Sequence, residues 1–190
     1  MSRHFTKLAS GIDVAPLAAQ LDEHPDLWDA NPLRRTAPGT PHGGMADIWV
    51  RYNDPKNIGP RFNDEHIPVW YPAWKALPAL RPLVFDIMAR VQGEMLCGVL
   101  ITKIPPGDGI KPHIDKGWHA EFTEKLYLSV KNGPGAIFAA DDGAWEESIE
   151  PKDGDLYLFD NRMEHWVENR SREDRITLIV CVRTDLFGRY

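Results

Sequence analysis

The sequence predicts a single, mainly β domain (residues 1–190), with a jelly-roll core at residues 95–185 behind a helical and loop-rich segment at residues 1–94. Two observations support this fold class. The 190 residues include 16 prolines and 15 glycines, which divide the chain into short elements. The turn sequences PPGDG, NGPG, DDG and PKDGD separate short, evenly spaced apolar runs in the second half of the chain. Short antiparallel strands of this kind pack as two sheets whose mouth can hold a small ligand.

The composition excludes several classes of protein. The 43% hydrophobic and 26% charged residues are typical of one globular domain. The net charge is −6 and no basic stripe is present, so nucleic acid is not an expected partner. We also expect no membrane anchor and a cytoplasmic location, because the sequence has neither a membrane-spanning apolar run nor the apolar part of a secretory signal. Cys97 and Cys181 lie in apolar runs and are expected to be reduced thiols. The sequence does not indicate an oligomeric state.

Two helices are expected in the N-terminal half. The first begins near Asp13, has Pro16 in its first turn and ends at Pro25. The second is best defined from Pro82 onward, where aliphatic residues recur at helical spacing, and Gly93 stops it. Both helices therefore have one apolar face that can cover a sheet.

One strand lies between two long loops in the same half. Residues 47–52 (DIWVRY) alternate as a strand does, with aliphatic residues on one face and Trp49 and Arg51 on the other. The flanking loops are residues 31–44 and 53–68, and loops of such length in a compact domain usually bind a ligand or cover a site.

Eight further strands are expected after the second helix. Strand count alone also allows an open sandwich in place of the jelly roll. The expected strands are residues 95–104, 113–116, 124–131, 136–140, 146–150, 155–160, 164–169 and 175–184.

A metal site is the strongest chemical signal. The chain has three His-x-acid triplets, of which the one at His24 lies at a helix end and is expected to be solvated. His113 and Asp115 follow a turn into a predicted strand, where residues two apart share a face. His165, just after the apolar strand DLYLFD, supplies a third ligand. Two imidazoles and one carboxylate on one face of an octahedron are the arrangement of non-haem Fe(II) oxygenases.

A receptor for a dicarboxylate follows the second histidine. Arg175 lies ten positions beyond His165, and Thr177 shares its strand face. A guanidinium beside a hydroxyl suits a carboxylate, because the guanidinium fork binds both oxygens. The alternative for Arg175 alone is an ordinary ion pair with Glu173 or Asp174.

In this order the motifs resemble those of Fe(II)/2-oxoglutarate-dependent oxygenases. More narrowly, most of the chain resembles the aspartyl/asparaginyl β-hydroxylase family, through LW, DIWVRY, EKLYLSV, AWEE, DGDLYLFDNRMEHWVENRS and DRITLIVCV. Residues 145–182 are the most specific part. Two positions depart from the family pattern: Asp115 stands where Gly is usual, and Lys125 stands where Arg is usual.

The resemblance implies a double-stranded β-helix, or cupin-like jelly roll, with Fe(II) at its mouth. The implied catalytic and metal-binding residues are His113, Asp115 and His165. The implied 2-oxoglutarate-binding residues are Arg175, Thr177, Lys125 and Tyr127. The implied reaction hydroxylates an unactivated C–H bond and releases succinate and CO2, with ascorbate as an accessory reductant. Two alternatives remain open: a cupin-type metalloenzyme that does not use 2-oxoglutarate, and a non-catalytic jelly-roll binding module.

The substrate is the least determined element. Cationic and imidazole groups in the two long loops favour a small, carboxylate-bearing substrate, either an amino acid or a peptidyl side chain. A lipid acyl chain is a further alternative, although no amphipathic anchoring helix is evident. The loop residues of this kind are Arg34, Arg35, His42, Arg61 and His66. The candidate substrate-binding residues are His42, Arg51 and His119.

Overall fold

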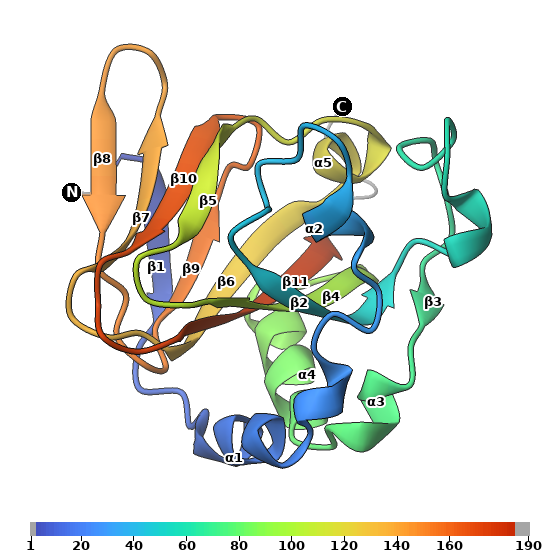
Figure 1. Ribbon diagram of the computed structural model, residues 1–190, viewed down its shortest axis with the longest axis horizontal. Helices are drawn as coiled ribbons and strands as arrows, with labels where there is room; N and C mark the ends of the chain where they lie inside the picture. The colour runs from blue at the N-terminus through green and yellow to red at the C-terminus, as the bar shows by residue number, and fades with distance from the viewer. Residues whose placement is uncertain (1–2, 185–190) are drawn as a thin grey trace.

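The computed structural model describes residues 3–184, and its centre is a pair of facing β-sheets (Figure 1). The larger sheet has the strand order β1-β9-β6-β11-β4-β2-β3, the smaller sheet has the order β5-β10-β7-β8, and the paired strands are antiparallel. The predicted mainly β, jelly-roll fold is confirmed. The strands of the larger sheet are β1 (Phe5–Ala9), β2 (Ala46–Tyr52), β3 (Val69–Trp70), β4 (Met95–Ile104), β6 (Glu124–Lys131), β9 (Leu156–Phe159) and β11 (Arg175–Arg183). Those of the smaller sheet are β5 (Gly109–His113), β7 (Ala136–Asp141), β8 (Glu146–Ile149) and β10 (Glu164–Asn169).

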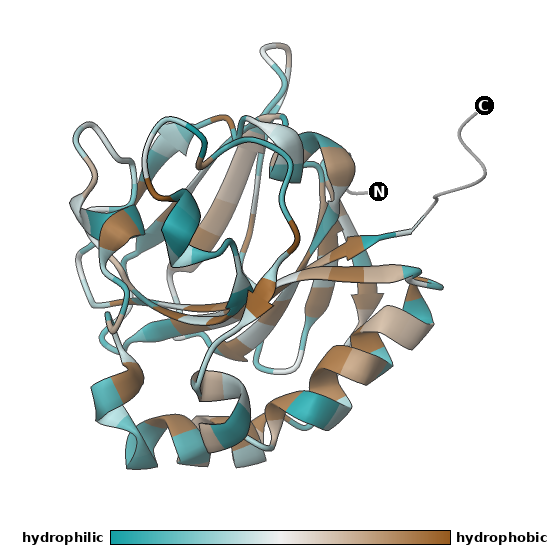
Figure 2. Ribbon diagram, turned by 90° about the vertical axis from the view of Figure 1, so that its right-hand side faces the viewer, coloured by the Kyte–Doolittle hydropathy of each residue, from teal (hydrophilic) through white to brown (hydrophobic). Residues whose placement is uncertain are grey.

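Helices cover the outer face of the larger sheet (Figures 1 and 2). The two longest are α1 (Ala15–Glu23) and α4 (Leu80–Arg90), and α3 (Ala73–Ala76) lies near them. Leu17 of α1 and Val84 of α4 are fully buried in one apolar cluster with aliphatic residues of β2, β4 and β11. Burying one such side chain stabilises the fold by about 1.5–3 kcal/mol. Within the described residues no helix is long and apolar enough to cross a membrane.

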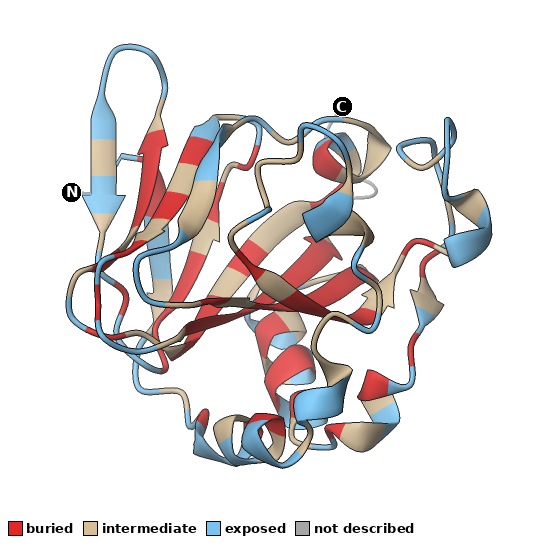
Figure 3. Ribbon diagram, in the orientation of Figure 1, coloured by how far each residue is buried: buried red, intermediate tan, exposed pale blue. Residues whose placement is uncertain are grey.

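A second apolar cluster fills part of the space between the sheets. The rings of Phe5, Phe138 and Phe159 pack with centroid distances of 4.9, 5.4 and 5.0 Å. The ring of Phe159 also lies 5.0 Å from that of His165. Figure 3 shows many buried residues in β7 and in the central strands of the larger sheet, whereas β5 and β8 are more exposed. The aromatic cluster therefore forms an apolar wall beside one candidate metal ligand.

The N-terminal segment supplies strands as well as helices. β1, β2 and β3 all come from residues 1–94 and extend both edges of the larger sheet. β1 is not among the strands predicted from the sequence, and its partner β9 lies about 150 positions further along the chain. The predicted elements also do not include β3, α3 or two short helices, α2 (Leu33–Thr36) and α5 (Trp118–Phe122). Residue 185, where the predicted core ends, lies outside the described residues.

One predicted strand was misplaced. The strand predicted at residues 113–116 is β5, which covers Gly109–His113 and ends at the histidine. Gly107 has a φ of 82° and closes the preceding turn, so the strand begins earlier than expected. Pro112 fits within β5 because β5 is the edge strand of the smaller sheet.

Candidate metal centre

Three candidate ligands come together between the sheets. One ligand atom from each of His113, Asp115 and His165 lies within 4.8 Å of the other two. The Nε2 atom of His113 is 3.6 Å from Oδ1 of Asp115, and the Nε2 atom of His165 is 4.0 Å from Oδ2 of the same carboxylate. The two histidines lie on β5 and β10, which are neighbouring strands of the smaller sheet. The structure therefore brings together all three residues that the sequence predicts as metal ligands.

Asp115 reaches the site from a loop and not from the predicted strand. It lies in the loop after β5, so it does not share a strand face with His113 as predicted. The backbone N–H of Asp115 donates to the carbonyl of Asn161 at 3.1 Å, and the Asn161 side-chain amide donates to Asp115 Oδ2 at 3.3 Å. Asn161 thus fixes the loop against the chain that follows β9. In the sequence, the position of Asn161 four residues before His165 is the feature that could have predicted this contact.

Backbone contacts set the tautomer of both histidines. Nδ1 of His113 lies 2.8 Å from the carbonyl of Lys111, and Nδ1 of His165 lies 2.9 Å from the carbonyl of Met163. A carbonyl only accepts, so Nδ1 carries the proton and donates in each case. The unprotonated Nε2 atoms therefore face Asp115 with free lone pairs, as a metal-binding histidine requires.

The charge state at neutral pH also fits a divalent metal. Burial lowers the pKa of His165 to about 4 and lowers that of His113 as well, so both rings are neutral. Burial opposes ionisation of Asp115, but the charge and the hydrogen bond of Lys125, together with the neighbouring imidazoles, outweigh it and hold the pKa of the carboxyl well below its usual range. Two neutral imidazoles and one carboxylate form the donor set of a facial Fe(II) site.

Lys125 and Tyr127 lie on β6 next to this donor set. The ammonium of Lys125 contacts Oδ2 of Asp115, and although burial opposes it, this carboxylate raises the pKa of the lysine. The ring of Tyr127 packs 4.9 Å from that of Phe138, and burial raises the pKa of its hydroxyl. Both side chains thus border the cleft that contains the triad. In this structure Lys125 contacts a candidate metal ligand directly.

Arg175 is a buried cation without a counter-ion among residues 3–184. Its side chain lies on β11, the residue is 4% exposed, and Nε has no hydrogen-bond partner. Burial lowers the pKa of its guanidinium to about 10. Glu173, one of the ion-pair partners considered above, instead contacts Nζ of Lys131 at 3.0 Å. A buried charge is costly unless something pairs with it, so this position favours an anionic ligand.

Thr177 and a second threonine lie beside that cation. Thr177 is 3% exposed and pairs across the ladder with Thr102 of β4. Thr102 lines the cleft of about 40 Å³ that contains His113, Asp115 and His165. Thr102 is not among the residues predicted from the sequence, although a hydroxyl inside the apolar strand LITKI is a signal that could have identified it.

A larger cavity of about 460 Å³ opens beside Asp115. The two long loops form much of its wall, and both His42 and His119 line it. Burial lowers the pKa of His42 to about 2 and that of His119 to about 3, so both rings are neutral at pH 7. Two of the three residues predicted to bind substrate thus line one cavity together with Asp115, a candidate metal ligand.

Arg51, the third such residue, lies elsewhere. The ladder between β2 and β4 is irregular between Trp49 and Arg51, and Arg51 pairs with Val99, a member of the helix-covered cluster. A bulge of this kind breaks the two-residue alternation on which the prediction depended. The guanidinium lies 4.7 Å from the ring of Trp70, and Nε donates to the carbonyl of Leu96 at 3.0 Å. The structure therefore does not bring Arg51 to the metal site.

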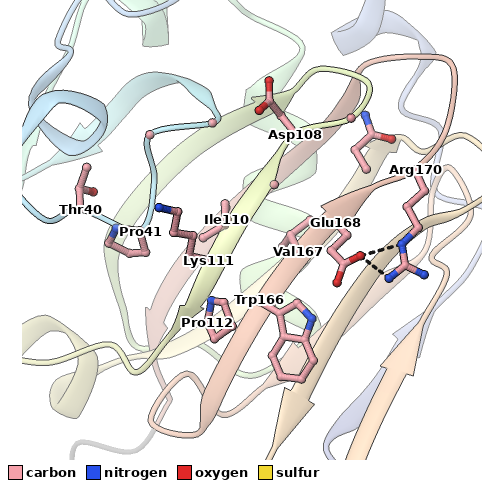
Figure 4. Close-up of a pocket in the computed structure, with 15 residues that line it drawn as sticks. Thr40, Pro41, Asp108, Ile110, Lys111, Pro112, Trp166, Val167, Glu168 and Arg170 are labelled. Atoms are coloured by element: carbon pink, nitrogen blue, oxygen red, sulfur yellow. Dashed lines mark hydrogen bonds and ion pairs between the residues drawn. The ribbon is translucent and has the colours of Figure 1, made fainter.

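A second large cavity, of about 590 Å³, lies along β5 and β10 (Figure 4). Figure 4 shows Thr40 and Pro41 on one side and Trp166 on the other, with an ion pair between Glu168 and Arg170. None of the three candidate metal ligands lines this cavity. We therefore assign the site to the cavity next to Asp115.

Comparison with known proteins agrees with this geometry. Residues 70–184 match the family described as aspartyl/asparaginyl beta-hydroxylase. No curated protein matches the chain by sequence.

Several solved structures share the fold. A prolyl hydroxylase from Trichoplax adhaerens, in complex with a hypoxia inducible factor oxygen degradation domain peptide fragment, superposes with a TM-score of 0.65 at 14% identity, over 97% of this chain and 85% of that chain. A Pseudomonas putida prolyl-4-hydroxylase gives 0.56 at 17% identity, over 96% and 93%. An oxidoreductase of the 2OG-Fe(II) oxygenase family from Burkholderia pseudomallei gives 0.55 at 11% identity, over 73% of this chain and 66% of that chain. At these identities the likeness is one of fold.

Proposed function

The chain belongs to the aspartyl/asparaginyl β-hydroxylase family, and from that premise we propose that it hydroxylates an unactivated C–H bond of a small carboxylate-bearing substrate. It is an Fe(II)/2-oxoglutarate-dependent hydroxylase, and the proposed products from the cosubstrate are succinate and CO2. The observation that carries the proposal is the presence of a His-Asp-His cluster together with the buried guanidinium of Arg175, whose Nε has no hydrogen-bond partner, on β11 of the facing sheet. A cupin-type enzyme that does not use 2-oxoglutarate has no need of that guanidinium.

His113, Asp115 and His165 would hold the iron. The donor set suits Fe(II), because both Nε2 atoms are free of protons and the carboxyl is ionised. When bound, the iron supplies the oxidising chemistry with dioxygen and 2-oxoglutarate. The protein contributes the orientation of its ligands: Lys111 and Met163 orient the imidazoles, and Asn161 orients the carboxylate.

Arg175 and Thr177 would bind the distal carboxylate of 2-oxoglutarate. Both are buried between the sheets, where water cannot compete for the guanidinium. Lys125 and Tyr127 would provide the remaining polar groups around the cosubstrate, and the ring of Phe138 forms an apolar part of the cleft wall. Ascorbate would serve only to keep the iron reduced.

The substrate would enter the cavity of about 460 Å³, which is in the size range of small-molecule sites. His42 and His119 line it as neutral hydrogen-bonding groups. The Trichoplax adhaerens protein is in complex with a peptide fragment, so a peptidyl side chain is included in the proposed substrate class. Both cysteines, Cys97 and Cys181, are free and buried, which suits a reducing compartment, and we assign the activity to the cytoplasm.

Substrate-stimulated succinate formation tests this function. The iron-loaded protein is incubated with 2-oxoglutarate, ascorbate and a panel of amino acids, short peptides, acyl lipids and oligonucleotides. We expect stimulation by an amino acid or a peptide, with equal amounts of succinate and hydroxylated product. Stimulation by lipids or oligonucleotides alone would contradict the substrate class. Turnover of a substrate without any 2-oxoglutarate would favour the cupin-type alternative, and a purified protein that binds no metal would favour the binding module.

A further inference from the structure

Arg34 lies where the two cavities next to the metal ligands meet. It belongs to α2, in the first of the two long loops. Its side chain lines the cavity of about 460 Å³ and also the cleft of about 40 Å³ that contains His113, Asp115 and His165. A group bound to Arg34 would therefore lie within one small molecule's length of the candidate iron site.

Arg34 is held in place before any ligand arrives. Its Nη1 donates to Oδ2 of Asp47 at 2.8 Å, and the same oxygen accepts from the indole N–H of Trp49 at 3.2 Å. Asp47 is only 1% exposed, so this ion pair is screened from water. The hydroxyl of Thr40 donates to the carbonyl of Arg34 at 2.6 Å and fixes the loop that carries it. A receptor held in this way loses little conformational entropy when it binds.

The guanidinium keeps donors available for a ligand. It carries five N–H groups. Within residues 3–184, Asp47 is the one residue to which the Arg34 side chain donates a hydrogen bond. The side chain is 14% exposed, and that exposed part borders the cavities. A second carboxylate is the partner that its free edge would bind best.

The rest of the wall limits the kind of molecule that fits. Two other cationic side chains line the larger cavity: Lys125 contacts Asp115, and Lys116 is exposed at the surface. Among the described residues Arg34 is thus the one sheltered cation there that does not contact a candidate metal ligand. The apolar part of the wall comprises Leu33, Ala37, Ile58, Phe62, Leu100 and Cys181.

We propose that Arg34 binds the anionic group of the substrate and that the enzyme selects small monocarboxylates with an apolar body, such as free amino acids with aliphatic or aromatic side chains. This inference rests on the proposed function and narrows it. A substrate with a second anionic group, such as aspartate, would have to place that group against the apolar wall, where no sheltered cation meets it. With its carboxylate bound to Arg34, the substrate would direct its apolar part toward the iron.

Binding measurements test the role of Arg34 without relying on turnover. Calorimetry under anaerobic conditions measures the affinity of the protein, loaded with Fe(II) and 2-oxoglutarate, for leucine, phenylalanine, aspartate and leucinamide. We expect wild type to bind leucine or phenylalanine at least 30-fold more tightly than aspartate or leucinamide, since losing a charged partner of a sheltered group costs about 2 kcal/mol or more. Arg34→Met should weaken binding of the two monocarboxylates by a similar factor and leave that of leucinamide unchanged.

Arg35→Met is the matched control. Arg35 is the next residue of α2, is exposed and pairs with Asp29 at 3.3 Å, so its loss should change no affinity. If Arg34→Met does not fold, the double variant Arg34→Met/Asp47→Asn removes both charges and should lose the same affinity. Iron and 2-oxoglutarate binding is measured in the same variants. If it is unchanged while substrate affinity does not follow the prediction, the role proposed for Arg34 fails and the proposed function stands. Tighter binding of aspartate than of leucine, no binding of either monocarboxylate by wild type, or equal losses in the Arg34 and Arg35 variants would overturn the proposal.

Discussion

His113 and His165 are direct cross-strand partners: their Cα atoms face one another in the antiparallel ladder between β5 and β10, and their ring centroids lie 4.2 Å apart. Each ring also donates from Nδ1 to the carbonyl two residues before it. Strand pairing therefore sets the distance between the two candidate ligands, and the local backbone sets their orientation. The smaller sheet thus provides a preformed pair of nitrogen ligands, to which Asp115 adds a carboxylate from a loop.

The first prediction concerns metal binding. His113→Ala, Asp115→Ala and His165→Ala should each reduce Fe(II) affinity at least 10-fold, because each removes one of three ligands. His24→Ala is the matched control, since His24 begins a His-x-Asp triplet at a helix end and is not part of the candidate ligand cluster. Anaerobic iron titration measures these affinities. Unchanged affinity in both His113→Ala and His165→Ala would mean that the metal binds elsewhere.

The second prediction separates the two roles considered for Arg175. Because the unpaired buried guanidinium destabilises the apoprotein, Arg175→Met should raise its free energy of unfolding by about 1–3 kcal/mol. In the Fe(II)-loaded protein, the same change should abolish the stabilisation that 2-oxoglutarate gives wild type, about 2.7 kcal/mol at 100 times Kd. Urea denaturation with and without 2-oxoglutarate measures both effects. Arg172→Met, an exposed neighbour, should show neither. A destabilised Arg175→Met apoprotein would indicate a structural ion pair instead.

The third prediction concerns Arg51, which the structure puts on the helix-covered side of β2. Arg51→Met should lower the free energy of unfolding by about 1 kcal/mol, because it removes a cation–π contact with Trp70 and a hydrogen bond to the carbonyl of Leu96. The KM values for 2-oxoglutarate and for the substrate should stay the same. Thermal unfolding and steady-state kinetics test the two parts. A raised substrate KM at unchanged stability would return Arg51 to the substrate site.

The fourth prediction is a loss of stability in mild acid. Burial lowers the pKa of His119 from 6.5 to about 3 in the folded protein, so the unfolded chain takes up a proton at higher pH. Stability should therefore be complete above pH 6.5 and fall as the pH decreases, by about 2 kcal/mol from this one group at pH 5. His119→Gln should flatten the pH dependence of the metal-free protein by that amount in urea denaturation. An unchanged slope would show that His119 is protonated in the folded state.

Sequence patterns predicted those parts of the fold that depend on local alternation. β6 and β10 have the predicted bounds, and the apolar faces of α1 and α4 are buried as expected. Pairing between distant segments could not be predicted from local patterns. The residues of β1 show little strand pattern of their own, and the strand is defined by its ladder with β9. The bulge next to Arg51 is equally invisible in DIWVRY, because alternation looks regular until the partner strand is known.

The candidate site was predictable where residue chemistry is distinctive. The order of His113, Asp115 and His165 predicts the three candidate metal ligands that the structure brings together, but not the route of Asp115 through a loop. Arg34 was one of several cations in the loops, and nothing in its sequence context distinguished it from Arg35. Only the three-dimensional contacts separate them, because Arg34 pairs with a buried aspartate at the cavity while Arg35 faces solvent.

Native mass spectrometry under anaerobic conditions tests the central claim most directly, because it counts iron and 2-oxoglutarate on each chain without needing the substrate. The account predicts one Fe(II) and one 2-oxoglutarate per wild-type chain, neither on His165→Ala, and iron alone on Arg175→Met. Retention of iron by His165→Ala, or 2-oxoglutarate binding that is independent of both iron and Arg175, would contradict it.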